Sequence, residues 1–330
     1  MRLVTFETET VPAGPGILID GDTAIVALQT TCGSSAAISS MQELIDGGQA
    51  ALDQATSAVA NTRGRSAHSI EDCRLLAPLP VPAQIRDCMT FKKHAVNAPR
   101  GAARYMAAKT NDPEATFSAI EATGQLELAP VWYDIPIYYK ANRFGVVGTE
   151  TDIPWPKYSS LRDFELEVAV VIGRRGVDIQ SHDAEGHIFG YTIYNDFSAR
   201  DVQMKEMPGG LGPAKSKDFD HGIVLGPCIV TRDELPLSPG GKLELKMTAT
   251  VNGEVWGRGT SADVHHTFPS VIAHISQSET LYPGEVIGSG TVGDGCGIEH
   301  GKFLDDGDVV ELEIERIGKI SNTIVVEGGS

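Results

Sequence analysis

The sequence predicts a strand-dominated α+β protein, in which a small N-terminal α/β domain precedes a large β-roll or β-sandwich domain with antiparallel or mixed strands. Many short runs rich in β-branched and aromatic residues are separated by Gly, Pro and Asn turns. Patterns with helical spacing are few and short. Strands and helices do not alternate as in βαβ units, which argues against a doubly wound parallel sheet.

The N-terminal part combines strand and helix patterns. Three short strands are predicted within residues 2–30, and an amphipathic helix over 40–60 follows the capping pattern Ser40–Glu43. Gly47 and Gly48 are expected to weaken or break this helix.

A polar loop over 61–69 and an extended connector over 75–85, which carries three prolines, end the N-terminal part. We therefore predict domains at 1–77 and 78–330. The first of these shows no motif that carries chemistry.

The larger part begins with a helical segment over 87–109, interrupted by Pro99, and a short helix over 111–122. Residues 208–217 lack periodicity and are predicted to form a loop, while Asn252-Gly253 predicts a hairpin turn. The remaining predicted strands are 131–140, 144–148, 164–173, 190–196, 223–231, 242–260, 284–293 and 308–318, and the remaining predicted helices are 197–206 and 268–276.

The strand Phe164–Gly173 contains two acidic residues. Because side chains alternate along a strand, Glu165 and Glu167 point to one side together with Ala169 and Val171. Two unpaired buried carboxylates would cost several kcal/mol, which a bound cation would remove. A solvated strand face explains this stretch equally well.

Other acidic residues join this pair as candidates. Asp196 ends the next strong strand, and Asp87 follows the connector. Carboxylates are hard oxygen ligands, so the set would suit Mg²⁺, Mn²⁺ or Ca²⁺ and not zinc. Asp196 also fits as the N-cap of the helix that follows it.

Histidines and a glycine motif allow several interpretations. His94 is a candidate general base, seven residues after Asp87, although packing is an alternative. The motif 288–293 matches G-x-G-x-x-G, but no helix or βαβ unit follows, so a turn that brings backbone N–H groups and the Thr291 hydroxyl to a ligand is favoured. The other candidates are His265, His266 and His274, which fit packing around a helix better than metal ligation, and Arg200, Gln203 and Lys217, which could also form a solvated polar face.

Composition limits the partners and the compartment. The net charge of −17 argues against nucleic acid and anionic membranes. No apolar run approaches the roughly 20 residues of a membrane span, and the first residues lack a signal-peptide pattern. Five cysteines without a C-x-x-C pair indicate reduced thiols, which predicts a cytoplasmic protein.

Four segments together resemble a known family. In order they are FELEVAVVIG, GYTIYNDFSARDVQ, SKDFD with LGPCIVT, and TLYPGEVIGSGT. Their order and spacing resemble the fumarylacetoacetate hydrolase family over about residues 75–320. The resemblance implies a mixed β-roll catalytic domain, a small N-terminal domain, a homodimer and one divalent cation, Mg²⁺ or else Mn²⁺ or Ca²⁺.

The resemblance also implies roles for particular residues. Lys217 corresponds to a lysine near the metal, and Arg200 and Gln203 to substrate-facing groups. Tyr139 and Thr291 correspond to substrate contacts. The implied metal ligands are Asp87, Glu165, Glu167 and Asp196.

Within this family the hydrolases resemble a pattern in which a histidine seven residues after the first metal aspartate pairs with a late glutamate. His94 and Glu299 match that pattern, whereas decarboxylase-type members carry a glutamate where this chain has Asn97. The resemblance therefore implies a hydrolase that cleaves a C–C bond in a small anionic diketo acid, either an acylpyruvate or a compound like fumarylacetoacetate. The alternatives are a decarboxylase or tautomerase of oxaloacetate-like acids, and a keto-sugar-acid dehydratase or hydrolase. Residues 88–90 and the loop 209–217 differ from the usual pattern of the family. These differences concern the identity of the substrate and not the metal ligands.

Overall fold

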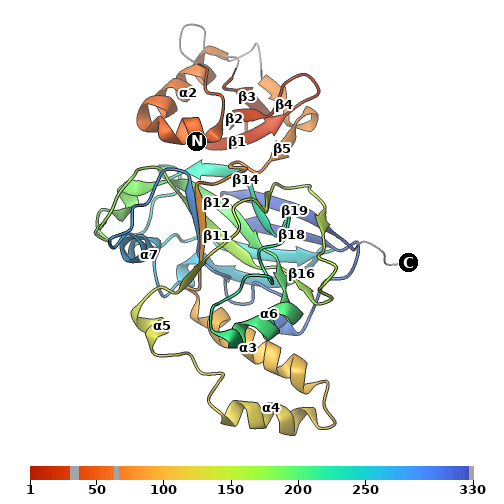
Figure 1. Ribbon diagram of the computed structural model, residues 1–330. Coiled ribbons are helices and arrows are strands. Elements are labelled where there is room, and N and C mark those ends of the chain that lie inside the picture. Colours follow the sequence, from red (N-terminus) through yellow and green to blue (C-terminus); the bar gives the residue numbers. More distant parts are fainter. Residues whose placement is uncertain (30–36, 63–66, 327–330) are drawn as a thin grey trace.

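The computed structural model describes residues 1–29, 37–62 and 67–326. Within these ranges the strands form a twelve-stranded sheet, a five-stranded sheet and a two-stranded pair (Figure 1). The large sheet contains β1 (Arg2–Glu7), β2 (Gly14–Ile19), β3 (Ala24–Ala27), β4 (Ala67–Ser69), β5 (Arg74–Leu76), β6 (Gln84–Cys88), β7 (Tyr138–Lys140), β8 (Val146–Val147), β11 (Leu166–Ile172), β12 (Ile188–Asp196), β14 (Ile223–Thr231) and β17 (Glu285–Gly288). The five-stranded sheet contains β9 (Ile153–Pro154), β15 (Lys246–Val251), β16 (Glu254–Thr260), β18 (Val309–Ile314) and β19 (Gly318–Val325), and β10 (Arg162–Asp163) pairs with β13 (Ser198–Ala199).

Strand pairing in both large sheets is mixed. Most neighbours are antiparallel, whereas β17–β6, β14–β8 and β19–β9 are parallel. The path through the large sheet runs β4-β3-β2-β1-β14-β12-β11-β17-β6-β7. The predicted class, a strand-dominated α+β fold with a mixed roll or sandwich, is therefore confirmed.

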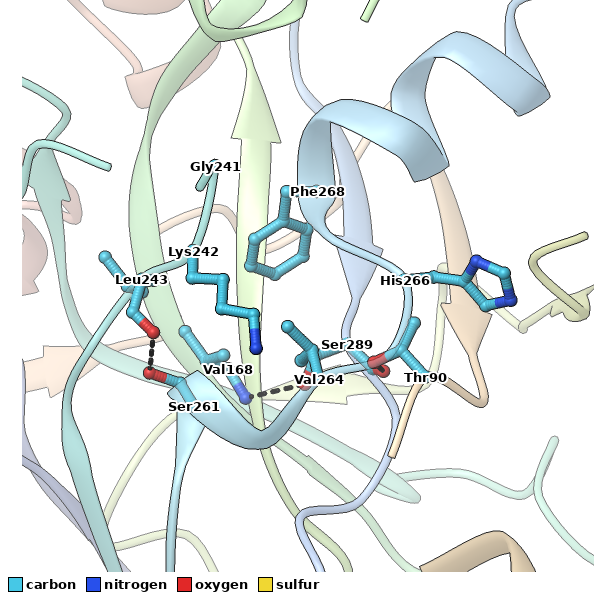
Figure 2. Close-up of a pocket in the computed structure, with 10 residues that line it drawn as sticks. All are labelled: Thr90, Val168, Gly241, Lys242, Leu243, Ser261, Val264, His266, Phe268 and Ser289. Carbon is cyan, nitrogen blue, oxygen red and sulfur yellow. Dashed lines mark hydrogen bonds between the residues drawn. The ribbon is translucent and has the colours of Figure 1, made fainter. Parts of the chain in front are cut away.

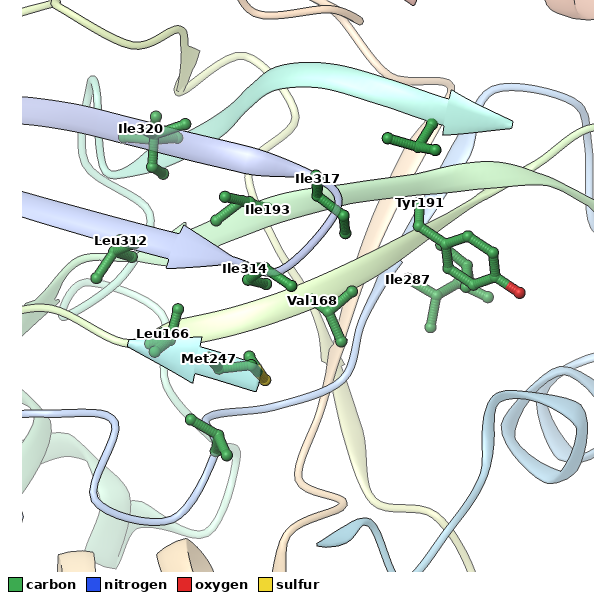
Figure 3. Packing of buried hydrophobic residues seen from close by; sticks show 14 of the residues in the cluster. Leu166, Val168, Tyr191, Ile193, Met247, Ile287, Leu312, Ile314, Ile317 and Ile320 are labelled. Atoms are coloured by element: carbon green, nitrogen blue, oxygen red, sulfur yellow. The ribbon is translucent and has the colours of Figure 1, made fainter. Parts of the chain in front are cut away.

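The main hydrophobic core lies between the two sheets (Figure 3). Leu166 and Val168 of β11 pack there with Met247 of β15 and Leu312 of β18. The alternate residues Ala169 and Val171 belong to a second cluster on the other face of β11. This alternation confirms the predicted orientation of the strand, and it places Glu167 on the face away from the main core.

The N-terminal strands extend the large sheet, because β1 pairs with β14. Helices α1 (Met41–Asp46) and α2 (Gly48–Thr62) pack against these strands, and the predicted break at Gly47 is confirmed. The Ser40 hydroxyl accepts a hydrogen bond from the Glu43 N–H at 3.1 Å, as the capping pattern predicts. The domain boundary at residue 77 stays a prediction.

The other helices are α3 (Lys92–Ala107), α4 (Pro113–Ala122), α5 (Val131–Asp134), α6 (Arg200–Glu206) and α7 (Phe268–Ile275), and the 3₁₀ turns are η1 (Ile70–Asp72), η2 (Ala184–His187), η3 (Met207–Gly209), η4 (Ser261–Asp263) and η5 (Ile298–His300). The predicted strand 131–140 is wrong in its first half, which forms α5. Trp132 is buried there and its indole N–H donates to the Met89 carbonyl at 2.8 Å, a contact that favours the helical turn. The helix predicted over 197–206 begins later, because Ser198 and Ala199 pair with β10.

Two further predictions concern thiols and membranes. Among the described cysteines, Cys73, Cys88, Cys228 and Cys296 are free thiols, and Cys32 lies outside the described residues. Over the described ranges, no helix combines the length and the apolar character that crossing a bilayer requires. The cytoplasmic location stays a prediction.

Candidate metal centre and active site

Four carboxylates from separate parts of the chain meet on one face of the large sheet. Asp87 lies on β6, Glu167 on β11 and Asp196 at the end of β12, while Glu165 directly precedes β11. One carboxylate oxygen from each lies within 4.8 Å of the others. None of the four residues is more than 5% exposed. These are the residues that the sequence predicts as metal ligands, and the fold brings all four together.

A glycine keeps the space between the carboxylates open. Gly288 of β17 lies between Ala169 and Asp87 in the sheet register. A Cβ atom at this position would lie 2.4 Å from Asp87 Oδ1 and 2.9 Å from Glu167 Oε2. Any side chain here would therefore fill the centre of the cluster, so the sheet needs glycine at this position.

The donor set fits a hard divalent cation. The Oδ1 atoms of Asp87 and Asp196 are buried and have no hydrogen-bond partner among the described residues. Burial, with the nearby Asp196 carboxylate, raises the pKa of Asp87 to about 8, and burial beside Asp87 raises the pKa of Glu167 well above its usual range. A buried, oxygen-only cluster in which Asp87 and Glu167 resist ionisation could hold Mg²⁺, Mn²⁺ or Ca²⁺, whose charge would favour their ionised forms. The alternative role of Asp196 as a helix N-cap is wrong, since Ala199 occupies the N-cap of α6.

Two cations offset part of this negative charge. Lys217 Nζ lies 2.6 Å from Glu165 Oε2 and 2.7 Å from Asp196 Oδ2, and Arg200 Nη2 lies 2.8 Å from Glu165 Oε1. Burial alone would raise the pKa of Glu165, but Lys217 and Arg200 outweigh it and hold this pKa far below its usual range. Arg200 was expected to face the substrate; it is instead 2% exposed and is absent from the lining of the cavity described below.

Asp163 connects the two halves of the site, and the sequence reasoning missed it. Its fully buried carboxylate accepts hydrogen bonds from Arg200 Nε at 2.8 Å, Gly297 N at 2.7 Å and Ile298 N at 3.0 Å. Arg200 contacts Glu165, and Ile298 directly precedes Glu299. The only sequence signal for Asp163 is an acidic residue two positions before Glu165.

The remaining predicted polar residues also meet the cluster. Arg200 Nη1 donates to Gln203 Oε1 at 2.9 Å, which leaves the amide N–H groups of Gln203 free to face the cavity that it lines. The Tyr139 hydroxyl donates to Asp196 Oδ2 at 2.5 Å, and the Thr291 hydroxyl lies 3.4 Å from Glu167 Oε1. Both Tyr139 and Thr291 line the cavity.

The glycine turn around residue 290 supports a metal-ligand candidate and not a dinucleotide. The Gly290 N–H donates to Glu167 Oε2 at 2.9 Å. Gly290 has a φ of +80°, and a Cβ there would lie 2.2 Å from the Cys88 carbonyl oxygen. The sequence predicts that backbone N–H groups of this turn lie near a ligand. The Gly290 N–H instead donates to the carboxylate of Glu167, a candidate metal ligand.

His94 lies beside the cluster, and a hydrogen bond on the opposite side of its ring fixes its orientation. It is carried by α3, and its Nδ1–H donates to Glu299 Oε1 at 2.6 Å. Glu299 is itself held by the Asp294 N–H, and its side chain is fully buried. The other ring nitrogen, Nε2, lies 3.8 Å from Glu165 Oε1. The pairing predicted from the sequence therefore exists, and it directs one imidazole nitrogen toward the carboxylates.

These groups form the inner end of a cavity of about 430 Å³. Its lining includes Asp87, His94, Glu165, Glu167, Gln203, Lys217, Tyr139 and Thr291, together with apolar residues farther out.

A second pocket, shown in Figure 2, lies on the opposite side of β11, where Val168 points. Its volume of about 10 Å³ is roughly that of one water probe, so it is too small for a substrate. His266 borders it and donates from Nε2–H to the Trp132 carbonyl at 2.8 Å, while His265 donates from Nε2–H to the Tyr133 carbonyl at 3.1 Å. These two histidines hold α5 in place.

The fold and the site define a class of β-roll proteins with a buried carboxylate cluster that could bind a divalent cation. Residues 109–325 of this chain match the protein family described as "Fumarylacetoacetate (FAA) hydrolase C-terminal". The chain belongs to the fumarylacetoacetate hydrolase family.

Two curated relatives are named as tautomerases. Oxaloacetate tautomerase YisK of Bacillus subtilis (strain 168) is 30% identical over 268 residues, which cover 79% of this chain and 76% of that protein. The mitochondrial oxaloacetate tautomerase FAHD2A of Homo sapiens is 38% identical over 191 residues, which are 58% of this chain. That match spans 59% of the human protein.

Solved structures share the fold at low sequence identity. A maleylpyruvate hydrolase from Sphingobium sp. SYK-6, in complex with manganese(II) and pyruvate, aligns over 99% of each chain with a TM-score of 0.71 and 20% identity. A probable 2-hydroxyhepta-2,4-diene-1,7-dioate isomerase from Mycobacterium abscessus aligns over 99% of each chain with a TM-score of 0.70 and 23% identity. The similar proteins are thus enzymes of several reaction types.

Proposed function

We propose that this chain is a divalent-metal-dependent hydrolase that cleaves a C–C bond in a diketo acid of the acylpyruvate type. The observation that carries the proposal is the placement of His94, whose Nε2 faces the carboxylate cluster while Nδ1 is held by Glu299. A general base must lie within reach of the proton that it takes, in the correct tautomer. Glu299 favours the tautomer with a proton on Nδ1, so Nε2 is free to accept one.

The four carboxylates would hold the cation, for which Mg²⁺ or Mn²⁺ is proposed and Ca²⁺ also fits the donor set. When bound, it supplies the positive charge that polarises a keto oxygen and stabilises an enolate. Gln203 offers amide N–H donors to the substrate, and Thr291 offers a hydroxyl. Lys217 already contacts Glu165 and Asp196, so its charge chiefly offsets theirs.

His94 would move the protons of the reaction. Its Nε2 takes a proton from water, and the hydroxide adds to the acyl carbonyl carbon. The bond between that carbon and the neighbouring CH₂ carbon then breaks, and its electron pair forms the pyruvate enolate. The imidazolium returns the proton to the CH₂ carbon, which yields pyruvate and a carboxylic acid with atoms and charge balanced.

Tautomerisation of oxaloacetate is the second candidate, because the curated relatives described above carry that name. It needs the same metal and a base but no nucleophilic water. The homodimer implied by the resemblance is also a proposal, and size-exclusion chromatography with light scattering would test it.

The test is turnover of acetylpyruvate by the full chain with Mg²⁺ or Mn²⁺, followed by loss of enol absorbance and by pyruvate formed. His94→Ala should lower kcat by about 10²–10⁴, the usual contribution of a general base, while cation binding measured by calorimetry persists. His182→Ala, an exposed histidine outside the cavity lining, serves as the control. Full hydrolysis by His94→Ala would contradict the assignment, and retained oxaloacetate tautomerisation without hydrolysis would favour the second candidate.

A further inference from the structure

The cavity changes character from its inner to its outer end. The inner end is formed by the buried carboxylates, His94 and Lys217. The outer end is lined by side chains without charge, which we call the outer wall: Met89, Ile137, Tyr138, Met207, Leu211 and Pro213. The whole cavity has a volume of about 430 Å³. It extends well beyond what the pyruvate part of a substrate needs.

The distribution of cations along the cavity limits the substrate. Among the described lining residues, the basic ones are Lys217 and His94, which are 3% and 8% exposed and lie at the inner end. Lys217 is already engaged by Glu165 and Asp196. A second carboxylate on the substrate would therefore meet no cationic side chain among the described residues of the outer wall. Desolvating an unpaired charge is strongly unfavourable.

The loop that carries part of the outer wall presents apolar side chains to solvent. Leu211 is 99% exposed and Met207 is 47% exposed. Gly210 (φ +78°) and Gly212 (φ +100°) flank Leu211 with left-handed backbone conformations. Exposed large apolar side chains beside a ligand cavity indicate a surface that gains from apolar contact.

The loop over residues 207–213 follows helix α6, and hydrogen bonds to the next residues hold its C-terminal end. The Glu206 carboxylate accepts hydrogen bonds from the N–H groups of Ala214, Lys215 and Ser216, each at 3.0 Å. Gln203 lies on the preceding helix α6 and lines the inner part of the cavity. The segment that carries Leu211 therefore also carries two polar residues of the cavity lining, Gln203 and Lys217.

We propose that the substrate is a monocarboxylic 2,4-diketo acid with an uncharged apolar tail, an alkyl or aryl group that the outer wall contacts, and that dicarboxylic keto acids are poor substrates. The inference rests on the proposed function of the same site. It assigns Leu211 and Met207 as specificity-determining residues that touch the tail and not the reacting atoms.

The experiment compares kcat/KM of the full chain for acylpyruvates with methyl, propyl, pentyl and phenyl tails against oxaloacetate and fumarylpyruvate. Each added methylene should raise kcat/KM up to about fourfold, the equivalent of roughly 0.8 kcal/mol of apolar burial. Calorimetry with 2-oxoalkanoates of increasing length gives a binding readout that does not depend on turnover. Affinity should rise along that series.

Leu211→Ala should flatten the dependence on tail length, and Leu211→Lys should lower activity on long tails and raise it on the dicarboxylates. Val177→Lys, which adds the same charge at a half-exposed apolar position outside the cavity lining, is the matched control. Hydrolysis that favours fumarylpyruvate, or that ignores tail length, would overturn the inference and leave the hydrolase proposal standing. Turnover of oxaloacetate alone would overturn both. Absence of turnover with every compound would overturn both.

Discussion

The inner end and the outer wall of the cavity are built in opposite ways. The inner carboxylates lie on or beside β6, β11 and β12 of one sheet, are at most 5% exposed, and are held by buried hydrogen bonds and ion pairs. The outer wall comes largely from loops and includes a fully exposed leucine. Side chains on a sheet are positioned more accurately than those on loops, whereas loops change more readily. The comparison ties the candidate cation ligands to the sheet and the proposed choice of substrate to the loops.

The largest effect should follow from removing one inner carboxylate. Glu167→Gln keeps the shape of the side chain and an acceptor for the Gly290 N–H, but it removes a charge from the proposed cation ligands. Turnover should fall on the order of 10³-fold, since a metal contributes several kcal/mol to transition-state stabilisation. Metal titration by calorimetry and kcat/KM with Mn²⁺ measure this, with the exposed Glu185→Gln as control. Unchanged affinity and activity would show that Glu167 is not a ligand.

A smaller effect should follow from substituting Asp163. This substitution tests whether the metal-ligand candidates and the His94–Glu299 pair depend on each other. Asp163→Asn weakens the contacts to Arg200 and to the loop that carries Glu299, so kcat should fall about 10–100-fold with KM little changed. The pH profile of kcat should shift as well, because His94 and Glu299 lose their fixed geometry.

The control for Asp163 is Asp201→Asn, which lies on α6 next to Arg200 and whose carboxylate accepts from the Ser159 hydroxyl at 2.6 Å and the Ser160 N–H at 3.0 Å. A melting temperature that falls in both variants without any change in the pH profile would mean that Asp163 only stabilises the fold.

The smallest expected effect is a dependence of folding stability on pH. It arises from the charged inner end of the cavity and not from the uncharged outer wall. Because the pKa of Asp87 is raised to about 8, the folded chain binds this proton more tightly than the unfolded chain does. The contribution of Asp87 to stability is therefore present below its usual pKa and is lost as pH rises toward about 8. Glu165 behaves oppositely, since its lowered pKa adds stability that is lost only in strong acid.

A divalent cation should replace these protons and reverse the loss. Mn²⁺ should raise the melting temperature more at about pH 8 than at about pH 6, and a cation at 100 times its Kd stabilises by about 2.7 kcal/mol. Differential scanning calorimetry with and without a chelator measures the difference. An equal shift at both pH values would argue against proton displacement from the carboxylates.

Much of the fold and of the inner end could be predicted from the sequence. Alternation along 164–173 put Glu165 and Glu167 on one face, and the family resemblance implied the pairing of His94 with Glu299. Local patterns failed where a tertiary contact decided the outcome. Residues 131–134 read as a strand but form a helical turn around buried Trp132.

The sequence by itself determined the strand-rich fold, the faces of β11 and the chemical type of the ligands, because these depend on side-chain alternation and on residue identity. Tertiary structure alone decided that Arg200 lies behind Glu165, that Asp163 joins both halves of the site, and that Gly288 leaves space among the carboxylates. These features arise from contacts between residues far apart in the chain, and no local period records such contacts.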